Sequence, residues 1–352
     1  MSVHRRRLDE DLERIRRRVA AVGARVDDGV GMAVHALLKG DRALAAEAVL
    51  NDFPINRTIR ELDAECHRFV ARHLPSAGHL RFVSSVLRLN IAIERIGDYA
   101  VTIARETEQL GAPPPAELAS LIRQMADQSR LMYRQALSSW VDQNADLARG
   151  TKALADGVDL QLDGAWKGML ALGKADDAPS LRRMFAFLII FSNLERVSDQ
   201  AKNICEEAVF TATGETKPPK QYKVLFLDEG NSRLSLLAEA MASRAYPESG
   251  DYSSAGWSPA ETIDPDLAAY LDERAMDLAA GAPKGLSDLA RSLRKQHVIV
   301  SLAGDPRPHL GLVPFNTIVL EWSIAGDLEN ATDQLGEQIR WLMEKLRGED
   351  AS

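Results

Sequence analysis

Apolar side chains recur every three or four positions along the first part of the chain, which is the spacing of amphipathic helices. In the first such stretch they lie at Leu12, Ile15, Val19, Val22 and Val26. The pattern predicts three long helices ending near residues 38, 74 and 110, and three more over 116–141, 143–172 and 179–211. Because the turns between them are short, we expect antiparallel bundles.

The last predicted helix repeats the third one. The motif Glu-Arg-x-x-Asp occurs at residues 94–98 and again at 195–199, which is 101 residues later. The apolar stripe around the motif recurs at the same offset, as Phe187, Ile190, Leu194 and Val197. Internal repetition of this kind predicts two copies of one three-helix bundle, over residues 1–110 and 111–212.

A change of pattern follows residues 213–221, a polar, proline-containing stretch that we interpret as a linker. Buried-type strands are then predicted at 222–227, 251–257, 297–302 and 316–322, and helices at 232–246, 264–276 and 329–347. Alternating strands and helices favour a parallel sheet that is covered on both faces. The fold class is therefore multidomain, with all-α tandem bundles followed by a doubly wound α/β domain over 222–348.

Composition narrows the class of protein. The chain of 352 residues is 45% hydrophobic and carries a formal charge of -8, which disfavours a general nucleic-acid binder. No run of about 18 apolar residues is present, and the basic start lacks an apolar segment, so we expect neither a membrane span nor a secretion signal. Cys66 and Cys205, both on or beside apolar stripes, are expected to be reduced core residues of a cytoplasmic protein. Acids interleaved with the arginines near the N-terminus, Asp11 included, predict a solvated mixed-charge helix.

The repeated motif carries the first candidate chemistry. Glu94 and Asp98 are four residues apart, so both lie on one face of a helix, and Glu195 and Asp199 repeat this geometry. Two stacked carboxylates repel each other, and a bound cation would remove that cost. Oxygen ligands favour hard metal ions, and Asn203 adds an oxygen one turn further on. The alternative is a surface network in which the nearby arginines Arg81, Arg95, Arg182 and Arg196 neutralise the acids.

The segments HLRFVSSVLRLNIAIERIGDYAVTIA and SLRRMFAFLIIFSNLERVSDQAKNI resemble the paired signature helices of the PhoU family of cytoplasmic phosphate-uptake regulators. The resemblance covers about residues 5–212. It implies tandem three-helix bundles with clusters of divalent or trivalent metal, usually iron, manganese or magnesium. It also implies partnership with the ATPase of a phosphate ABC transporter and with its sensor histidine kinase, a homodimer, and membrane association only through those partners.

The same resemblance assigns roles to residues. It makes Glu94 and Asp98 ligands of the first repeat and Glu195, Asp199 and Asn203 ligands of the second. Thr102 stands where the family has Asn or Asp, and this makes the first-repeat site the weaker candidate. Further acidic positions of the family's second helix fall on Asp52, Asn56, Asp156 and Asp159, for which exposed surface acids are an equally good interpretation.

A second candidate site lies in the C-terminal half. The segment VLFLDEGNSRLSLLAEA, at 224–240, joins a strand to a helix through a short loop, and such a loop collects backbone N–H groups suited to an oxyanion. It resembles the phosphate-binding loop of low-molecular-weight tyrosine phosphatases and thioredoxin-linked arsenate reductases. The segments SSAGW, RAMDL and HVIVSL support this resemblance over about 222–346. Loop residues carried over are Asp228, Gly230, Asn231, Ser232 and Ser235.

The catalytic side chains of that family are missing. Asp228 stands at the position of the nucleophilic cysteine and Leu234 at that of the oxyanion-binding arginine. Asp327 lies near the general-acid position without the usual proline after it. A fixed carboxylate and the loss of a bidentate arginine predict a pseudophosphatase without catalytic residues. Two alternatives stay open: an active phosphatase or arsenate reductase that uses Asp228, and a module that only dimerises or scaffolds.

Overall fold

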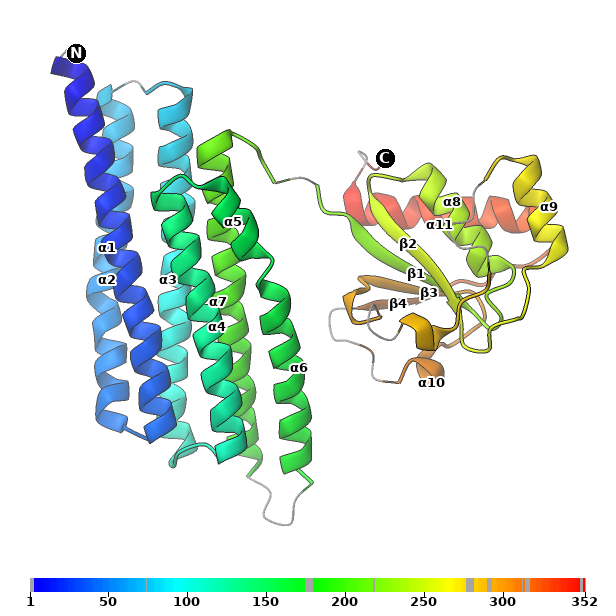
Figure 1. Cartoon of the computed structure of the whole chain (residues 1–352), viewed down its shortest axis with the longest axis horizontal. Helices are drawn as coiled ribbons and strands as arrows, with labels where there is room; N and C mark the ends of the chain where they lie inside the picture. Colours follow the sequence, from blue (N-terminus) through cyan, green and yellow to red (C-terminus); the bar gives the residue numbers. More distant parts are fainter. Residues whose placement is uncertain are drawn as a thin grey trace. The chain divides into compact units, whose positions relative to one another are not determined.

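The computed structural model describes residues 3–73, 75–174, 180–217, 219–276, 282–289, 293–311, 313, 317–348 and 351. The chain divides into two compact units, Met1–Lys217 and Pro218–Ser352. The first is helical, and the second contains the sheet (Figure 1). No helix in these ranges has both the length and the apolar character needed to cross a membrane.

The helical unit consists of long helices that lie side by side (Figure 1). The first repeat comprises α1 (Val3–Lys39), α2 (Arg42–His73) and α3 (Ala77–Leu110), and the second comprises α4 (Ala116–Val141), α5 (Ala145–Lys152), α6 (Ala155–Leu172) and α7 (Leu181–Thr213). The signature helices α3 and α7 pack against each other, and each also packs against the helices of its own repeat. The predicted tandem bundles are confirmed.

One predicted helix is wrong. The stretch 143–172 is two helices, α5 and α6, separated by a turn at Ala153 and Leu154. At this turn the backbone N–H groups of Leu154 and Gly157 bond three residues back, to Thr151 and Leu154, at 3.0 Å each. The three-residue bonds tighten the chain and reset the helix axis.

A single hydrophobic core runs through both repeats. Buried polar groups of α4 tie the repeats together: the indole N–H of Trp140 donates to Ser85 Oγ at 2.9 Å, and the Tyr133 hydroxyl donates to the carbonyl of Gly23 at 3.0 Å. Burial with a satisfied hydrogen bond is the usual situation of a core Trp or Tyr. The two repeats therefore form one compact unit.

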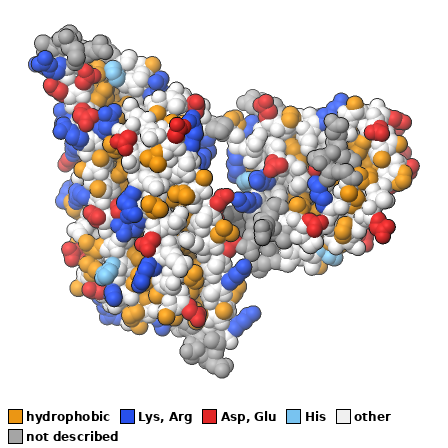
Figure 2. Space-filling view, viewed as in Figure 1, with side chains coloured by type: hydrophobic (Ala, Val, Ile, Leu, Met, Phe, Trp, Pro, Cys, Tyr) orange, Lys and Arg blue, Asp and Glu red, His pale blue; other side chains and the backbone are white. Residues whose placement is uncertain are grey.

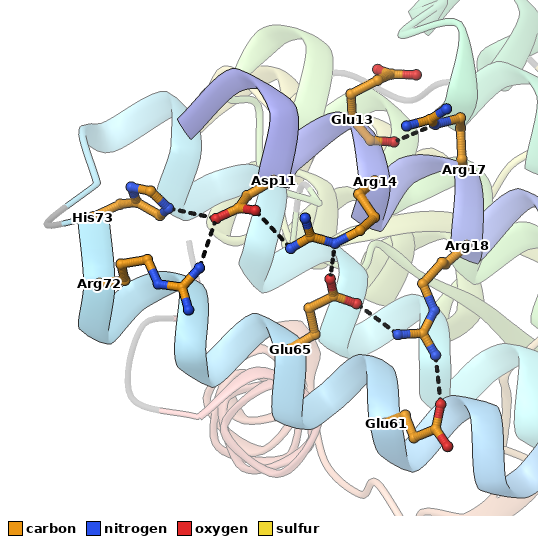
Figure 3. A network of polar contacts seen from close by, with 9 residues as sticks. All are labelled: Asp11, Glu13, Arg14, Arg17, Arg18, Glu61, Glu65, Arg72 and His73. Carbon is orange, nitrogen blue, oxygen red and sulfur yellow. Dashed lines mark hydrogen bonds and ion pairs between the residues drawn. The ribbon is translucent and has the colours of Figure 1, made fainter. Parts of the chain in front are cut away.

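The helices α1 and α2 are joined by buried charges (Figure 3). The carboxylate of Asp11 contacts His73 Nε2 at 2.7 Å and Arg14 at 2.7 Å, with Arg72 at 3.3 Å. Asp11 is only 8% exposed. The prediction of a solvated helix is therefore wrong at Asp11, because this acid faces α2 while its neighbours Asp9 and Glu10 face solvent.

A second buried acid, Glu65 of α2, lies one step along the same interface (Figure 3). Its two oxygens accept from Arg14 Nε at 2.5 Å and from Arg18 at 2.8 Å. Arg18 also reaches the exposed Glu61 at 2.7 Å. A buried carboxylate is costly unless it is paired in this way, so the network specifies how α1 and α2 align.

On the face drawn in Figure 2, acidic and basic side chains are interspersed over the helical unit, with hydrophobic side chains between them. This distribution agrees with the mixed charge of the sequence, in which 51 acidic residues slightly outnumber 43 basic ones.

The C-terminal unit is built on a parallel sheet of four strands in the order β2-β1-β3-β4. The strands are β1 (Tyr222–Asp228), β2 (Gly250–Gly256), β3 (Val298–Ser301) and β4 (Ile318–Glu321). The helices are α8 (Leu234–Ala245), α9 (Pro265–Glu273), α10 (Arg307–Leu310) and α11 (Leu328–Arg347), with short 3-10 turns η1 (Leu286–Leu289) and η2 (Leu293–Lys295). The predicted α/β fold is confirmed. Within the RAMDL segment, residues 277 and 278 lie outside the described ranges.

Both faces of the sheet are covered. Alternate residues of β1 divide between the faces: Val224 and Phe226 pack against α8, α9 and α11, whereas Leu225 and Leu227 pack toward Leu310 of α10. The second face is covered by α10 and the 3-10 turns, which are shorter elements than a crossover helix. Burial on both faces explains the continuous apolar run of β1.

Candidate metal and anion sites

In the first repeat the predicted ligands of α3 face acidic and amide groups of α2. Glu94 and Asp98 are exposed, while Asp52 is half-buried opposite them. The approach is close at Gly97, where a Cβ atom would lie 2.7 Å from Asp52 Oδ1. A glycine is therefore needed at this turn of α3 for the carboxylate of α2 to fit.

The charged surroundings of Asp52 are mainly acidic. Burial raises the pKa of Asp52, and the negative charges of Asp98 and Glu94 raise it further. A hydrogen bond from Asn56 Nδ2, at 2.7 Å, and the charge of Arg105 lower this pKa without reversing the net rise.

Two oxygens in this part of the first repeat are buried without a hydrogen-bond partner: Oδ1 of Asp52 and Oδ1 of Asn56. Buried polar atoms are normally paired, so an orphaned oxygen calls for an explanation such as a water or an ion. A hollow lined by Asp52, Asp98, Val101, Thr102 and Arg105 opens beside them. The Thr102 hydroxyl itself donates to the backbone oxygen of Asp98 at 2.9 Å.

In the second repeat the acid pair has a different neighbour. Glu195 and Asp199 are partly buried on α7, and Lys202 Nζ lies 2.7 Å from Asp199 Oδ1. Burial raises the pKa of Glu195 to about 7, with further contributions from the charge of Asp199, a hydrogen bond to it and the charge of Asp159. The sequence analysis missed Lys202, although its place three residues after Asp199 is the spacing of a helical ion pair.

The other predicted residues of this repeat are not all brought together. Asn203 lines a separate hollow between α3 and α7, with Arg88 and Arg95, and its amide donates to Gln200 Oε1 at 3.2 Å. Asp156 lies in the first turn of α6. Within the described ranges, no three His, Cys, Asp or Glu side chains are arranged to enclose a metal ion.

The arginines that could neutralise the acids point elsewhere. Arg196 lies over the ring of Tyr99, at 6.0 Å from its centroid, and Arg182 donates to Gln109. Among the described residues, neither these two nor Arg81 and Arg95 form an ion pair with the four motif acids. The motif acids are therefore not neutralised by the arginines of their own motif.

The loop after β1 is closed by its own carboxylate. Asp228 is 9% exposed, and its Oδ1 and Oδ2 accept the backbone N–H groups of Asn231 at 2.5 Å and of Ser235 at 2.9 Å. These N–H groups lie at the loop and at the start of α8, where an anion is favoured. Asp228, which stands at the position that the resemblance gives to the nucleophilic cysteine, thus takes up two N–H groups that could otherwise face an anion.

Asn231 holds the shape of the loop. It adopts a left-handed conformation, with φ 47°, and it is fully buried. Its side chain donates to Ser235 Oγ at 2.9 Å and accepts the backbone N–H of Lys284 at 2.7 Å. Gly256 at the end of β2 lies against the loop, since a Cβ atom there would be 2.6 Å from the carbonyl oxygen of Glu229.

The remaining loop residues do not restore the missing groups. The carbonyl of Ser232 accepts the N–H of Asp264 at 3.1 Å, and Arg233 pairs with the Asp264 carboxylate at 3.2 Å. Leu234 begins α8, while Gly230 accepts the N–H of Ala260 at 2.8 Å. Asp327 is the N-cap of α11 and accepts the N–H of Asn330 at 3.0 Å. This residue, which lies near the general-acid position in the sequence, therefore caps a helix.

The protein therefore consists of two parts. The first is a duplicated helical bundle with an acid pair in each repeat, and the second is a unit built on a parallel sheet. The model of the family described as "PhoU domain" matches this chain twice, at residues 19–107 and 122–208, which together make up half of the chain. The chain therefore belongs to the PhoU family.

Individual proteins and solved structures are similar to parts of this chain. A phosphate-specific transport system accessory protein PhoU homolog of Pseudomonas putida is 33% identical over 207 residues, covering 58% of this chain and 80% of that protein. The crystal structure of PhoU from Pseudomonas aeruginosa is 31% identical, with a TM-score of 0.55, over 59% of this chain and 99% of that one. An arsenate reductase in the phosphate binding state matches 36% of this chain and 99% of its own, at 21% identity and a TM-score of 0.31.

Proposed function

We propose that this chain is a cytoplasmic regulator of phosphate uptake, whose helical unit binds the ATPase of a phosphate ABC transporter and the sensor histidine kinase of the same system. The observation that carries the proposal is the pair of PhoU-domain matches over the two repeats, supported by relatives that are phosphate-specific transport system accessory proteins. The chain acts as a homodimer and reaches the membrane only through these partners.

The test is co-purification of the tagged full chain with both partners from phosphate-replete cells. We expect capture of the ATPase and the kinase, and loss of phosphate control of uptake when the chain is deleted. A scaffold that only dimerises would instead purify with itself alone and leave uptake unchanged. Recovery of neither partner from cells that contain both would overturn the proposal.

The helical unit is also proposed to bind a divalent or trivalent metal, such as iron, manganese or magnesium. In the first repeat Asp52, Asn56, Glu94 and Asp98 would supply the donors. These side chains are not gathered around one point in the structure, so binding would require Glu94 and Asp98 to turn toward Asp52. Two unpartnered buried oxygens and a raised Asp52 pKa support this assignment, because a cation would satisfy both. In regulation the metal would supply positive charge on a surface that otherwise carries stacked carboxylates.

Elemental analysis of the purified chain tests the metal. Asp52→Asn and Asp98→Asn are each expected to weaken metal affinity at least about tenfold, as loss of a ligand or of its support does. The purified variants should therefore contain less metal than the parent chain. Glu47→Gln, an exposed acid of α2, is the matched control. Equal metal content in all four proteins would refute this part of the proposal.

For the C-terminal unit we propose a pseudophosphatase, which supplies a contact surface without catalysis. Asp228 has both oxygens bonded to backbone N–H groups, and no arginine stands at Leu234. A nucleophile would need a free oxygen and a stabiliser for the transition state. The rival function, a phosphatase or arsenate reductase using Asp228, predicts aryl phosphate turnover or arsenate reduction that disappears in Asp228→Ala; we expect neither activity in the parent chain.

A further inference from the structure

The two repeats present the same acid pair at equivalent positions, but the side chain beside each pair differs. Glu94 and Asp98 precede Val101, whereas Glu195 and Asp199 precede Lys202, the residue 101 positions later. The residue three positions after the aspartate is therefore apolar in the first repeat and carries an ammonium group in the second.

Lys202 is placed as a counterion. Its Nζ lies 2.7 Å from Asp199 Oδ1, and its side chain is 27% exposed. The charges of Asp159 and Glu195 also act on it, so one ammonium group lies within the field of three carboxylates. A contact of this length between oppositely charged groups is a strong, charge-assisted hydrogen bond.

We infer that the Lys202 ammonium replaces the metal in the second repeat, so that the chain binds metal at the first-repeat acids and excludes it from the second. This inference rests on the proposed metal binding of the helical unit. It departs from the expectation that Glu195, Asp199 and Asn203 are ligands, because Asn203 lines a different hollow and Asp199 is already paired.

Competition explains the exclusion. A metal ion at Asp199 would have to displace an ammonium group that is attached to the same helix and therefore has a high effective concentration. It would also meet that positive charge at close range in a partly buried place, where repulsion is stronger than in water.

The first repeat offers no such group at the equivalent position. Val101 is 9% exposed and carries no charge. Arg105, the cation that lines the same hollow, is exposed and lies one turn further along α3. Oδ1 of Asp52 and Oδ1 of Asn56 have no hydrogen-bond partner there, whereas Oδ1 of Asp199 is paired with Lys202.

A reciprocal exchange tests the inference. Manganese(II) binding to the metal-stripped full chain is measured by isothermal titration calorimetry and by the electron paramagnetic resonance signal of free ion. In the parent chain, Asp52→Asn is expected to weaken binding at least about tenfold, and Glu195→Gln to change it less than about twofold. Lys202→Val is expected to add a second manganese site, which Glu195→Gln then removes. Val101→Lys is expected to abolish the first site.

Lys202→Arg retains the charge and should bind as the parent chain does, which separates charge from loss of folding. Circular dichroism of every variant checks that the helices are intact. If manganese in the parent chain is lost on Glu195→Gln, the metal lies at the second repeat, and both the inference and the proposed first-repeat site are overturned. If Lys202→Val adds no site, the inference is overturned while the proposed first-repeat site stands. If the parent chain binds no manganese but Lys202→Val does, the exclusion of metal by Lys202 stands and the proposed first-repeat site fails.

Discussion

The carboxylate of Asp228 accepts the backbone N–H of Ser235, seven residues later in the chain, at 2.9 Å. Its other oxygen accepts the N–H of Asn231, so one side chain closes the whole turn between β1 and α8. The N–H groups of Asn231 and Ser235 are thus both held by one side chain of the same unit.

Replacing Asp228 should therefore destabilise the loop without creating activity. Asp228→Ala leaves two buried N–H groups unpaired, and we expect a loss of about 2–4 kcal/mol in the free energy of local opening. Hydrogen exchange measured by mass spectrometry on peptides covering residues 228–240 reports this loss. Asp272→Ala, in an exposed position of α9, is the control.

Asp228→Cys restores a thiol at the nucleophile position but not the arginine, because Leu234 remains. We expect no measurable hydrolysis of an aryl phosphate by this variant, since transition-state charge would lack its main stabiliser. Turnover by Asp228→Cys alone would show that the arginine position matters less than the loop geometry indicates.

The buried acid Glu65 should matter more than its exposed neighbour Glu61. Glu65→Gln breaks charged bonds to Arg14 and Arg18, which are themselves half-exposed and can be rehydrated, so we expect a loss of about 1–3 kcal/mol. Glu61→Gln, with a side chain 66% exposed, should cost less than about 0.5 kcal/mol. Urea denaturation of both variants measures the difference, and equal losses would contradict the burial argument.

Acid should weaken the interface of α1 and α2 through Asp11. Burial tends to raise the pKa of Asp11, but hydrogen bonds from His73 and Arg14 outweigh it and lower the pKa below its ordinary value of 3.8. A depressed pKa contributes stability that is present above the unfolded-state value and lost as pH falls through the folded-state value. Between pH 4 and pH 2, Asp11→Asn should therefore show a flatter decline in unfolding free energy than the parent chain.

Gly97→Ala separates helix stability from the site. Alanine is the better helix former by about 1 kcal/mol, but its Cβ would lie 2.7 Å from Asp52 Oδ1 and push the carboxylate away. We expect manganese affinity to fall about tenfold. Gly29→Ala in α1, where no atom lies within 4 Å of the added Cβ, should be stabilising and leave the affinity unchanged. Equal affinity in the two variants would mean that Asp52 is not a ligand.

Both cysteines should resist alkylation in the folded chain. Burial raises the pKa of Cys66 to about 12, with further contributions from Asp63 and Glu65, and burial raises the pKa of Cys205 to about 12 as well. At pH 8 both thiols would therefore be almost entirely protonated, and the reactive form is the thiolate. Mass spectrometry after iodoacetamide treatment should find both thiols unmodified, and both modified in guanidinium.

The helical fold could be predicted from the sequence because each long apolar stripe determines which face of its helix is buried. The stripe of α3 leaves Glu94 and Asp98 exposed on one face, and the duplicated motif places Glu195 and Asp199 on one, partly buried, face of α7. The break between α5 and α6 was missed in the sequence. Gly150 and Gly157 lie close to it, but the turn itself is made by backbone bonds from Leu154 to Thr151 and from Gly157 to Leu154.

Pairings between helices are harder to predict than faces. Asp11 and Glu65 are buried because α1 and α2 align so that arginines and His73 meet them, and this alignment is a property of the packed helices. The placement of Asn203 likewise depends on how α7 packs against α3, whereas the pairing of Lys202 with Asp199 lies within α7 and has a spacing that the sequence shows. The replacement at Asp228 was visible in the sequence, but its two hydrogen bonds required the loop to be built.

The closure of the β1–α8 loop by Asp228 also limits what the C-terminal unit can report. The Asp228 carboxylate is part of the chain and cannot dissociate, so it holds the N–H groups of Asn231 and Ser235 equally in phosphate starvation and in phosphate excess. A detector needs an occupancy that varies with supply. The N–H groups of Asn231 and Ser235, which Asp228 already holds, therefore cannot report the supply of phosphate.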